Sequence, residues 1–321
     1  MPELPEVETI RRQIEPEVVG RRIVGSRILD ARWTRPLDPE PIAAALVGRE
    51  IVSVGRRGKY LLVGLDDGST LLMHLRMTGN LLLGERGETS RRFGMDRLYP
   101  APTEPAYLKA EFDLDDGRVL QFTDPRRFGH ASLLDSGELD PYLDSRIGVE
   151  PLGDELTAEL IGRVAEGRTV PLKSFLLDQK GIAGIGNIYA DEALHRAELH
   201  PLSPAGSMRP EHWEALREGI VDALEEGLRN GGASIDDYRD SRGEEGSMQD
   251  EFLVHTRAGE ECPRCGERIN RIVVGGRSTY FCPGCQVRLR RRRRPRRLGR
   301  AHRRASRSAT GPPPRRGRAA R

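Results

Sequence analysis

The spacing of apolar residues changes twice along the chain, and each change marks a different kind of structure. Val7, Ile10 and Ile14 recur at helical spacing, which predicts one amphipathic helix over residues 5–19. Short apolar runs divided by turns then continue to about residue 135, and several such runs predict an antiparallel sandwich or barrel. The pattern therefore indicates an α+β protein that begins with a helix packed against an antiparallel β-sandwich.

Two hairpins give the clearest strand signals in this region. Each consists of two apolar runs separated by Asp-Asp-Gly, and Asp-Gly favours the tight turns that match the twist of paired strands. The predicted strands cover residues 60–65, 69–75, 108–114 and 119–122. Residues 84–105 contain Arg, Gly and Pro without an apolar pattern, so we expect a loop there.

Beyond a stretch rich in Pro and Gly the apolar spacing becomes helical. The predicted helices cover residues 158–165, 172–179, 187–198 and 211–229. Residues 233–250 are polar and lack a core pattern, so we expect a flexible loop, followed by a strand at 252–256. The predicted divisions are a β-sandwich domain (1–135), a linker (136–157), a helical domain (158–251), a cysteine module (252–286) and a disordered Arg-rich tail (287–321).

Length and composition exclude several classes of protein. A chain of 321 residues has room for about two domains, and its apolar content of 37% is enough for packed cores. No run approaches the roughly 18 apolar residues of a membrane span, and the acidic, proline-containing start does not resemble a signal peptide. We therefore expect a cytoplasmic protein without membrane contact.

The charge is distributed unevenly. The net charge is +3, but 16 arginines and no acidic residue follow position 285, so residues 1–285 carry 36 basic and 49 acidic side chains, a net charge of −13. A nucleic acid would have to meet a local basic face of this acidic body. The Arg-rich tail is expected either to attract phosphate nonspecifically or to be an extension without function.

All the cysteines fit one metal site. They form two CxxC pairs separated by sixteen residues: Cys262, Cys265, Cys282 and Cys285. Two such pairs can close a tetrahedral zinc site with no open position for water, so the metal would be structural, and a redox CxxC motif fits the pattern less well. Between the pairs, apolar runs flank Gly275-Gly276 and predict a β-hairpin with Arg277 near its tip.

The first residues contain a candidate nucleophile. If Met1 is removed, Pro2 begins the chain as a secondary amine, and an α-amino pKa of about 8 leaves an appreciable part of it neutral. Such an amine can attack a sugar C1′ and form an iminium, and the Glu3 carboxyl can transfer protons. The alternative is an ordinary helix start, where Pro followed by Glu is common.

Other stretches contain residues suited to binding DNA. Gly184-Ile185-Gly186-Asn187 opens a predicted helix, where backbone N–H groups can bind a phosphate; a plain turn between helices is the alternative. Met77 and Phe128 lie in turns, and apolar side chains of this kind can enter a duplex and hold a nucleotide out of the stack. Lys59 lies beside a strand, where cations also serve to block strand pairing.

Several segments between residue 1 and about residue 286 resemble the bacterial formamidopyrimidine-DNA glycosylases. They read MPELPEVETIRR, RGKYLL, HLRMTG, DPRRFG and LDQKGIAGIGNIYADEALHRAELHP. The resemblance implies that Pro2 is the nucleophile and Glu3 the general acid/base. It also implies active-site roles for Glu6, Lys59 and Arg277, with Lys59 in contact with a phosphate near the lesion.

The same resemblance implies the residues that contact DNA. The phosphate contacts would be His74, Lys173, Asn187 and Arg277. The residues that fill the gap left by a flipped nucleotide and pair with the orphaned base would be Met77, Arg126 and Phe128. Residues 234–247 occupy the position of the family's lesion-capping loop.

We therefore expect a bifunctional DNA glycosylase and AP lyase that excises oxidised purines, 8-oxoguanine and formamidopyrimidines, from damaged duplex DNA. Its fold would combine the N-terminal β-sandwich and leading helix with a helix-two-turn-helix domain and a β-hairpin zinc finger that holds one zinc ion. It would be a monomer in the cytoplasm, associated with the nucleoid. Two alternatives stay open, an endonuclease VIII-like enzyme for oxidised pyrimidines and a DNA-binding zinc protein without catalysis.

Overall fold

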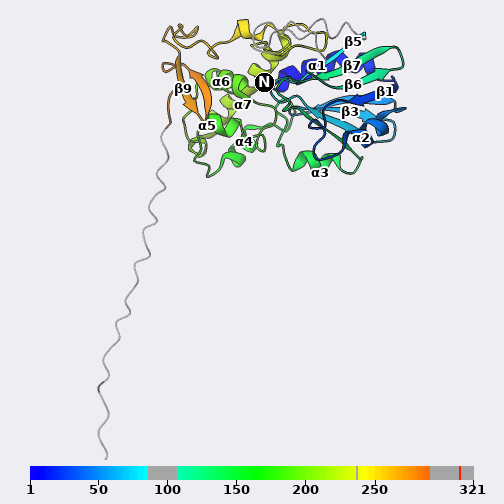
Figure 1. Ribbon diagram of the computed structural model, residues 1–321. Coiled ribbons are helices and arrows are strands. Elements are labelled where there is room, and N and C mark those ends of the chain that lie inside the picture. Colours follow the sequence, from blue (N-terminus) through cyan, green and yellow to red (C-terminus); the bar gives the residue numbers. More distant parts are fainter. Residues whose placement is uncertain (86–106, 236–237, 290–310, 312–321) are drawn as a thin grey trace, which may run out of the picture. The chain divides into compact units, whose positions relative to one another are not determined.

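Two four-stranded antiparallel sheets form the N-terminal half of the protein (Figure 1). The computed structural model describes residues 1–85, 107–235, 238–289 and 311. One sheet has the strand order β1-β6-β7-β5 and the other β2-β3-β4-β8. The strands are β1 (Ile23–Ile28), β2 (Ile51–Arg57), β3 (Tyr60–Leu65), β4 (Thr70–His74), β5 (Asn80–Glu85), β6 (Leu108–Leu114), β7 (Arg118–Thr123) and β8 (His130–Leu134). Side chains from both sheets share one core, which confirms the predicted sandwich.

Both predicted Asp-Asp-Gly hairpins are present. Strands β3 and β4 pair with Gly64 opposite Thr70, and β6 pairs with β7 in the same antiparallel manner. Gly68 and Gly117 complete the two turns with φ angles of +84° and +86°. Glycine adopts this left-handed conformation without a steric penalty, so the turn residues determine where the chain reverses.

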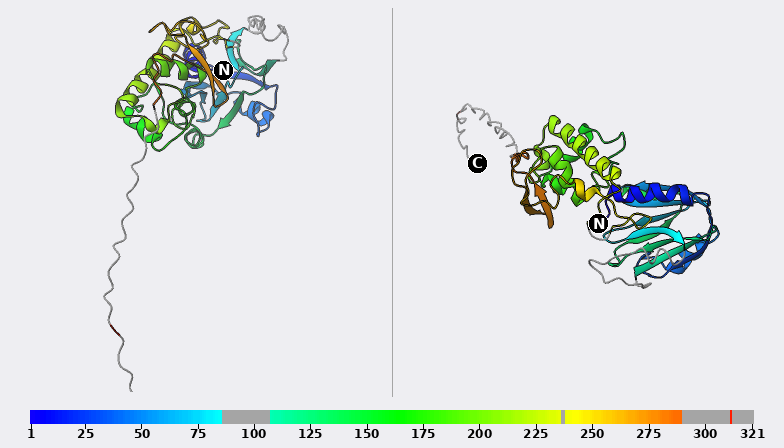
Figure 2. Two further views of the ribbon diagram at one scale, coloured as in Figure 1. Left: turned by 90° about the vertical axis from the view of Figure 1, so that its left-hand side faces the viewer. Right: turned by 90° about the horizontal axis from the view of Figure 1, so that it is seen from above.

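Helix α1 (Leu4–Val18) belongs to two hydrophobic cores. Val7, Ile10 and Ile14 are buried in the sandwich core, whereas Leu4 in the first turn is buried in the core of the helical half. Figure 2 shows α1 lying along the sandwich, with the N-terminus where the sandwich meets the helices. The first residues are therefore held between the two halves.

The C-terminal half is built from helices that pack around one core. They are α4 (Ala158–Ala165), α5 (Leu172–Leu176), α6 (Asn187–Arg196), α7 (Pro210–Arg229) and the 3₁₀ turns η2 (Ala205–Ser207) and η3 (Met248–Glu251). Helices α6 and α7 approach closely because a glycine lies at their contact: a Cβ on Gly227 would be 2.5 Å from the Tyr189 ring. The four predicted helices are confirmed, with α5 shorter than expected. Within the described part of the chain, no helix has the length and apolar character needed to cross a membrane.

A separate β-hairpin follows the helices. Strands β9 (Asn270–Val274) and β10 (Arg277–Phe281) pair in antiparallel fashion, with Arg277 opposite Val274. Gly275 and Gly276 have φ angles of +57° and +77°, the conformation of a two-residue hairpin turn that favours glycine. The predicted hairpin is confirmed, and Arg277 lies beside its turn.

Two short helices lie where the apolar spacing predicts none. They are α2 (Pro39–Leu46) and α3 (Leu139–Asp144). Helix α3 lies inside the predicted linker, where Leu143 and Ile147 are buried against strands β3 and β4. The linker is therefore packed onto the sandwich, because a few well-placed apolar residues are enough to bury a helix of six residues.

The polar segment 233–250 contributes to both cores, contrary to its expected lack of core residues. Tyr238 is 4% exposed in the sandwich core, and Met248 is fully buried in the helical core. The two residues are too far apart in the sequence to create an apolar period. The composition of this segment therefore does not show which of its residues belong to a core.

The predicted strand at 252–256 is wrong. The backbone N–H groups of Leu253, Val254 and His255 each donate to the Glu192 carboxylate at 3.0 Å, so they are bound to a side chain and not to a neighbouring strand. The predicted loop at 84–105 and the predicted tail lie almost entirely outside the described residues.

Candidate active site and metal centre

The carboxylate of Glu3 is held at the N-terminus of helix α6. Its oxygens accept the backbone N–H groups of Gly186 at 2.7 Å and Ile188 at 3.0 Å, with a longer bond of 3.4 Å from Tyr189. These donors and the positive end of the helix dipole favour a negative charge here. A Cβ at position 186 would lie 2.2 Å from Glu3 Cδ, so only glycine fits. The N–H groups that the sequence predicts for a phosphate therefore bind Glu3 instead.

Glu6 is buried one turn farther along α1. Its Oε2 accepts the backbone N–H of Glu3 at 2.7 Å, and its Oε1 accepts the Tyr189 hydroxyl at 2.7 Å and the Ala233 N–H at 2.8 Å. Burial, and then the charge of Glu3, raises the pKa of Glu6. These bonds tie α1 to α6 and to the residues after α7, so Glu6 fixes the position of Glu3.

Lys59 reaches the same place from the sandwich. Its ammonium donates to the carbonyl of Ile185 at 3.1 Å, and the residue is only 6% exposed. Burial lowers the pKa of Lys59, and the charges of Glu3 and Glu6 oppose this shift. The charge of Arg277 adds to the lowering, which puts this exposed arginine within electrostatic reach of the site.

Pro2 is buried at the start of α1, directly before Glu3. With Met1 in place, the Pro2 nitrogen is an amide. Removal of Met1 would convert this nitrogen into a secondary amine next to a fixed carboxylate and close to a buried lysine. The structure thus brings together the predicted catalytic residues that the sequence separates by up to 275 positions.

Lys173 and Asn187 hold the hairpin that carries Arg277. The Lys173 ammonium pairs with Asp191 at 2.7 Å and donates to the Ser278 carbonyl at 3.0 Å. Asn187 Nδ2 donates to the same carbonyl at 3.1 Å. Lys173 is 0% exposed, so its ammonium is not open to a phosphate in this arrangement. A DNA contact from Lys173 would require the ion pair to separate, and that contact stays a prediction.

Met77, Arg126 and Phe128 lie on two turns at the ends of strands. Met77, between β4 and β5, is 38% exposed, and Phe128, between β7 and β8, is 52% exposed, so neither belongs to a core. The Arg126 guanidinium carbon lies 5.0 Å from the centre of the Phe128 ring, within the range of a cation–π contact. The turns are adjacent, because the Thr78 hydroxyl donates to the Asp124 carboxylate.

His74 ends strand β4 and packs edge-on against Tyr60. Its Nδ1 accepts the Arg76 backbone N–H at 3.0 Å. Burial lowers the pKa of His74 well below its usual value, and the charge of Arg76 adds to this effect. The ring is therefore neutral at neutral pH, and a phosphate contact would use its other N–H as a plain hydrogen-bond donor.

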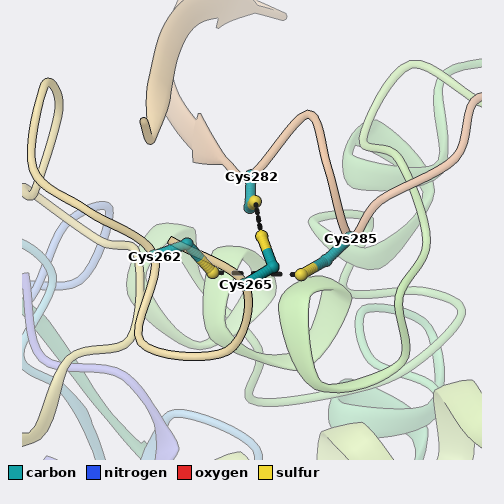
Figure 3. A group of neighbouring side chains, drawn as sticks. All are labelled: Cys262, Cys265, Cys282 and Cys285. Atoms are coloured by element: carbon teal, nitrogen blue, oxygen red, sulfur yellow. Dashed lines mark hydrogen bonds between the residues drawn. The ribbon is translucent and has the colours of Figure 1, made fainter. Parts of the chain in front are cut away.

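The cysteine sulfurs converge as a four-thiolate metal site requires (Figure 3). The sulfurs of Cys262 and Cys285 are 3.9 Å apart, those of Cys265 and Cys282 are 3.4 Å apart, and all four lie within 4.8 Å of one another. Zinc–sulfur bonds of about 2.3 Å in a tetrahedron place sulfurs roughly 3.8 Å apart, so the site fits one zinc ion. All four positions are occupied by protein, which makes the zinc structural.

Removing the zinc should detach the Arg277 hairpin from its fixed position. A small module of this kind depends on its metal for folding, so we expect chelated protein to bind a lesion-containing duplex roughly 10- to 100-fold more weakly, the loss of a charge-assisted contact. Fluorescence anisotropy would measure the affinity, and elemental analysis would measure the zinc. Re-added zinc should restore binding to the wild type but not to Cys262→Ser. Unchanged binding by metal-free protein would contradict the expectation.

Several residues that build the site have no signal in the sequence alone. Tyr189 binds Glu6, while Asp191 and Glu192 bind the segment that leads into the cysteine module. All three are buried positions of helix α6, and the partners named here lie more than 60 residues away in the sequence. Only their place inside a segment that resembles a known family could have indicated them.

Comparison with known proteins matches the chain part by part. Residues 1–131 match the model of the formamidopyrimidine-DNA glycosylase N-terminal domain, and residues 147–239 match the model of its H2TH domain. Residues 259–287 match the model of the zinc finger found in FPG and IleRS. The formamidopyrimidine-DNA glycosylases of Chloroflexus aurantiacus and Pelotomaculum thermopropionicum are 45% and 40% identical to it, covering 89% of this chain and 98% and 99% of theirs.

A solved structure agrees with these matches. The Lactococcus lactis Fpg in complex with DNA that contains an abasic site is 33% identical to this chain, and the two structures superpose with a TM-score of 0.78. The match covers 89% of this chain and 100% of the Lactococcus lactis chain. The part of this chain that the match does not cover is about as long as the Arg-rich tail.

A sandwich, a helix-two-turn-helix domain and a zinc finger, matched in this order, define a DNA repair glycosylase. Such enzymes combine removal of a damaged base with AP lyase activity. The chain belongs to the formamidopyrimidine-DNA glycosylase family, which confirms the predicted family, fold class and zinc cofactor.

Proposed function

We propose that Pro2, once Met1 is removed, is the nucleophile with which this enzyme excises 8-oxoguanine and formamidopyrimidines from duplex DNA. The observation that carries the proposal is the Glu3 carboxylate, which is fixed beside Pro2 by the N–H groups of helix α6. An amine next to an immobile carboxylate supplies a nucleophile and a proton carrier in one place. The oxidised-purine substrates agree with the name shared by the relatives and with a Lactococcus lactis neighbour solved with Fapy-dG containing DNA.

The reaction has two stages. The Pro2 lone pair forms a bond to C1′ as the bond between C1′ and the damaged base breaks. The base takes a proton from water, and the N–H proton of Pro2 passes to the Glu3 carboxylate. Glu3 gives a proton to the ring oxygen, the sugar opens, and the nitrogen–carbon bond becomes an iminium. Loss of a proton from C2′ then expels the 3′-phosphate, and a second elimination expels the 5′-phosphate. Water then hydrolyses the remaining iminium, which frees Pro2 and leaves a one-nucleotide gap.

The residues around the amine would hold the DNA. Lys59 and Arg277 bind phosphate near the lesion, since the charges of Glu3 and Arg277 both act on the buried Lys59 ammonium. Met77, Arg126 and Phe128 fill the space of the extruded nucleotide, supported by the exposure of Met77 and Phe128. Further phosphate contacts come from His74, Asn187 and, if its ion pair opens, Lys173.

Residues 234–247 would close over the lesion. The segment starts beside Glu6, because the Ala233 N–H donates to the Glu6 carboxylate at 2.8 Å and the Tyr238 hydroxyl donates to the Glu6 backbone carbonyl at 3.4 Å. A polar loop anchored at this point can cover a bound base. The enzyme would act as a cytoplasmic monomer at the nucleoid, since one chain supplies the whole site and the substrate is chromosomal DNA.

Borohydride trapping tests the proposed nucleophile. Sodium borohydride reduces an iminium to a stable amine, so protein incubated with a duplex that contains 8-oxoguanine should give a covalent protein–DNA adduct. Intact mass spectrometry of the same sample shows whether Met1 has been removed. Tight binding without an adduct would favour a DNA-binding zinc protein without catalysis.

A second duplex distinguishes the lesion class. One solved Lactococcus lactis Fpg, 34% identical with a TM-score of 0.77, contains DNA with an oxidised pyrimidine, so both classes need testing. We expect 8-oxoguanine to be released faster than thymine glycol, since the PELPEVE and DPRRFG segments resemble the purine branch. The opposite order would indicate an endonuclease VIII-like preference.

Deleting residues 287–321 should weaken the salt-dependent part of DNA binding. The tail and Gln286 contain 16 arginines and no acid, whereas residues 1–285 have a net charge of −13. If about five arginines contact phosphates, the slope of log K against log [salt] should fall by about 4 to 5 on deletion. Titrations of an undamaged duplex at several salt concentrations measure it, with an Arg→Ser tail of equal length as the control. An unchanged slope would mean that the tail does not contact DNA.

A further inference from the structure

One buried carboxylate connects the two turns that carry the proposed wedge residues. Asp124 is 1% exposed and follows strand β7. Its Oδ1 accepts the Thr78 hydroxyl and, at 3.2 Å, the Arg126 backbone N–H. Its Oδ2 accepts the backbone N–H of Gly129 at 2.7 Å. A single side chain thus binds the β4–β5 turn and both ends of the β7–β8 turn.

The proposed wedge residues Met77, Arg126 and Phe128 are the residues bound by Asp124 or their immediate neighbours in the sequence. Met77 is adjacent to Thr78, and Phe128 lies between Arg126 and Gly129, whose N–H groups both point to Asp124. The Arg126 N–H also contacts the Thr78 hydroxyl at 3.2 Å. The separation of Met77 from the Arg126–Phe128 pair therefore depends on Asp124.

The β7–β8 turn is strained in a way that needs such an anchor. Arg127 has a φ of +59°, a left-handed conformation unfavourable for an arginine. Its guanidinium pairs with Asp30 at 2.5 Å, which holds the turn from the other side. A Cβ on Gly129 would lie 2.7 Å from the Phe122 ring, so the chain passes close to the core. The turn is consequently fixed by several contacts, with Asp124 linking it to Met77.

We propose that Asp124 is the positioning residue that sets the geometry of the wedge formed by Met77, Arg126 and Phe128. The inference rests on the proposed function, because it assigns to Asp124 the support of a wedge that enters duplex DNA. Asp124 lies in a segment that resembles the family, but its role follows from its bonds to two turns. It acts on the extrusion of a nucleotide and not on the chemistry at C1′.

Asp124→Asn is the test variant, because asparagine has nearly the same shape but only one acceptor oxygen. Its NH₂ group must face either the Gly129 N–H or the Arg126 N–H and the Thr78 hydroxyl. The hydroxyl can accept a hydrogen bond but an N–H group cannot, so in either orientation the β7–β8 turn loses one of its bonds to residue 124. We expect release of 8-oxoguanine from a duplex to fall on the order of 10- to 100-fold, the effect of misplaced contacts. The fluorescence rise of 2-aminopurine placed next to an abasic analogue, which reports unstacking, should fall in parallel.

Cleavage of a single-stranded abasic oligonucleotide separates positioning from a general structural defect. This substrate has no opposing strand and needs no wedge, so the variant should cleave it within about twofold of the wild type. Asp144→Asn, an exposed residue at the end of α3, removes the same charge as a matched control. Thr78→Val removes one of the same bonds and should reproduce the loss on duplex DNA in part, which keeps the test valid if Asp124→Asn folds poorly.

Three results would overturn the inference. They are wild-type duplex activity in both variants, an unchanged 2-aminopurine signal, and equal losses on single-stranded and duplex substrates by well-folded protein. Failure of the proposed function looks different, since the wild type itself would then give neither a borohydride adduct nor base release.

Discussion

Replacing Pro2 with glycine should abolish the borohydride-trapped adduct and reduce the release of 8-oxoguanine on the order of 10²- to 10⁴-fold. Glycine is also small, so removal of Met1 should proceed as in the wild type. The pyrrolidine ring restricts rotation about the N–Cα bond and so fixes the direction of the nitrogen lone pair, whereas glycine lacks this constraint. A primary amine on a flexible residue loses both the orientation of the lone pair and the permanent charge of a proline iminium.

Binding measurements provide the control for the Pro2→Gly variant. Its affinity for a duplex with an uncleavable abasic analogue should match the wild type, because Glu3, Lys59 and the zinc finger are unchanged. Intact mass spectrometry must show that Met1 is absent from both proteins. Excision at the wild-type rate by protein with a blocked N-terminal nitrogen would exclude the proposed mechanism.

Replacing Glu3 with glutamine should slow base excision on the order of 10²- to 10⁴-fold, because an amide cannot deliver a proton. The side chain is 1% exposed and its oxygens accept N–H groups of Gly186 and Ile188. A glutamine must turn its NH₂ group toward one of these donors, so unfolding should also become easier by about 1–3 kcal/mol. Rates on the 8-oxoguanine duplex and thermal unfolding curves measure the two effects.

Glu40→Gln is the matched control for the Glu3 variant. Glu40 is exposed on helix α2, so the same chemical change there should alter neither rate nor stability measurably. The Glu3 variant should be assayed well below its unfolding temperature, so that the fraction folded is the same in all samples. Normal excision by a folded Glu3→Gln protein would show that another group carries the proton.

The elements that the sequence predicts well are those in which the local signal is strong. Helices α1, α4, α6 and α7 have apolar faces that repeat over several turns or end at clear breakers, and the two sandwich hairpins contain Asp-Gly turns. The cysteine spacing determines the metal site because four ligands in two CxxC pairs leave little freedom. In these cases a short stretch of chain contains the information that sets the structure.

The elements that were missed depend on distant partners. Helix α3 has one buried residue and helix α2 has only two, Ile42 and Leu46, so neither shows a clear period. Tyr238 and Met248 are single core residues in a polar segment. Residues 253–255 bind Glu192 through backbone groups that no residue pattern reveals. For the same reason, the sequence could name Glu3 through its resemblance to a family but could not show that it occupies the N-terminus of α6.

Helix α1 shares its first turn with one core and its later turns with the other, and this has a consequence for synthesis of the enzyme. Leu4 can be buried only after the helical half has emerged from the ribosome and folded, although it is among the first residues made. The surroundings of the proposed nucleophile, Pro2, are therefore completed late, although Pro2 is among the first residues translated. A truncated or half-made chain would lack a working centre and could not nick chromosomal DNA.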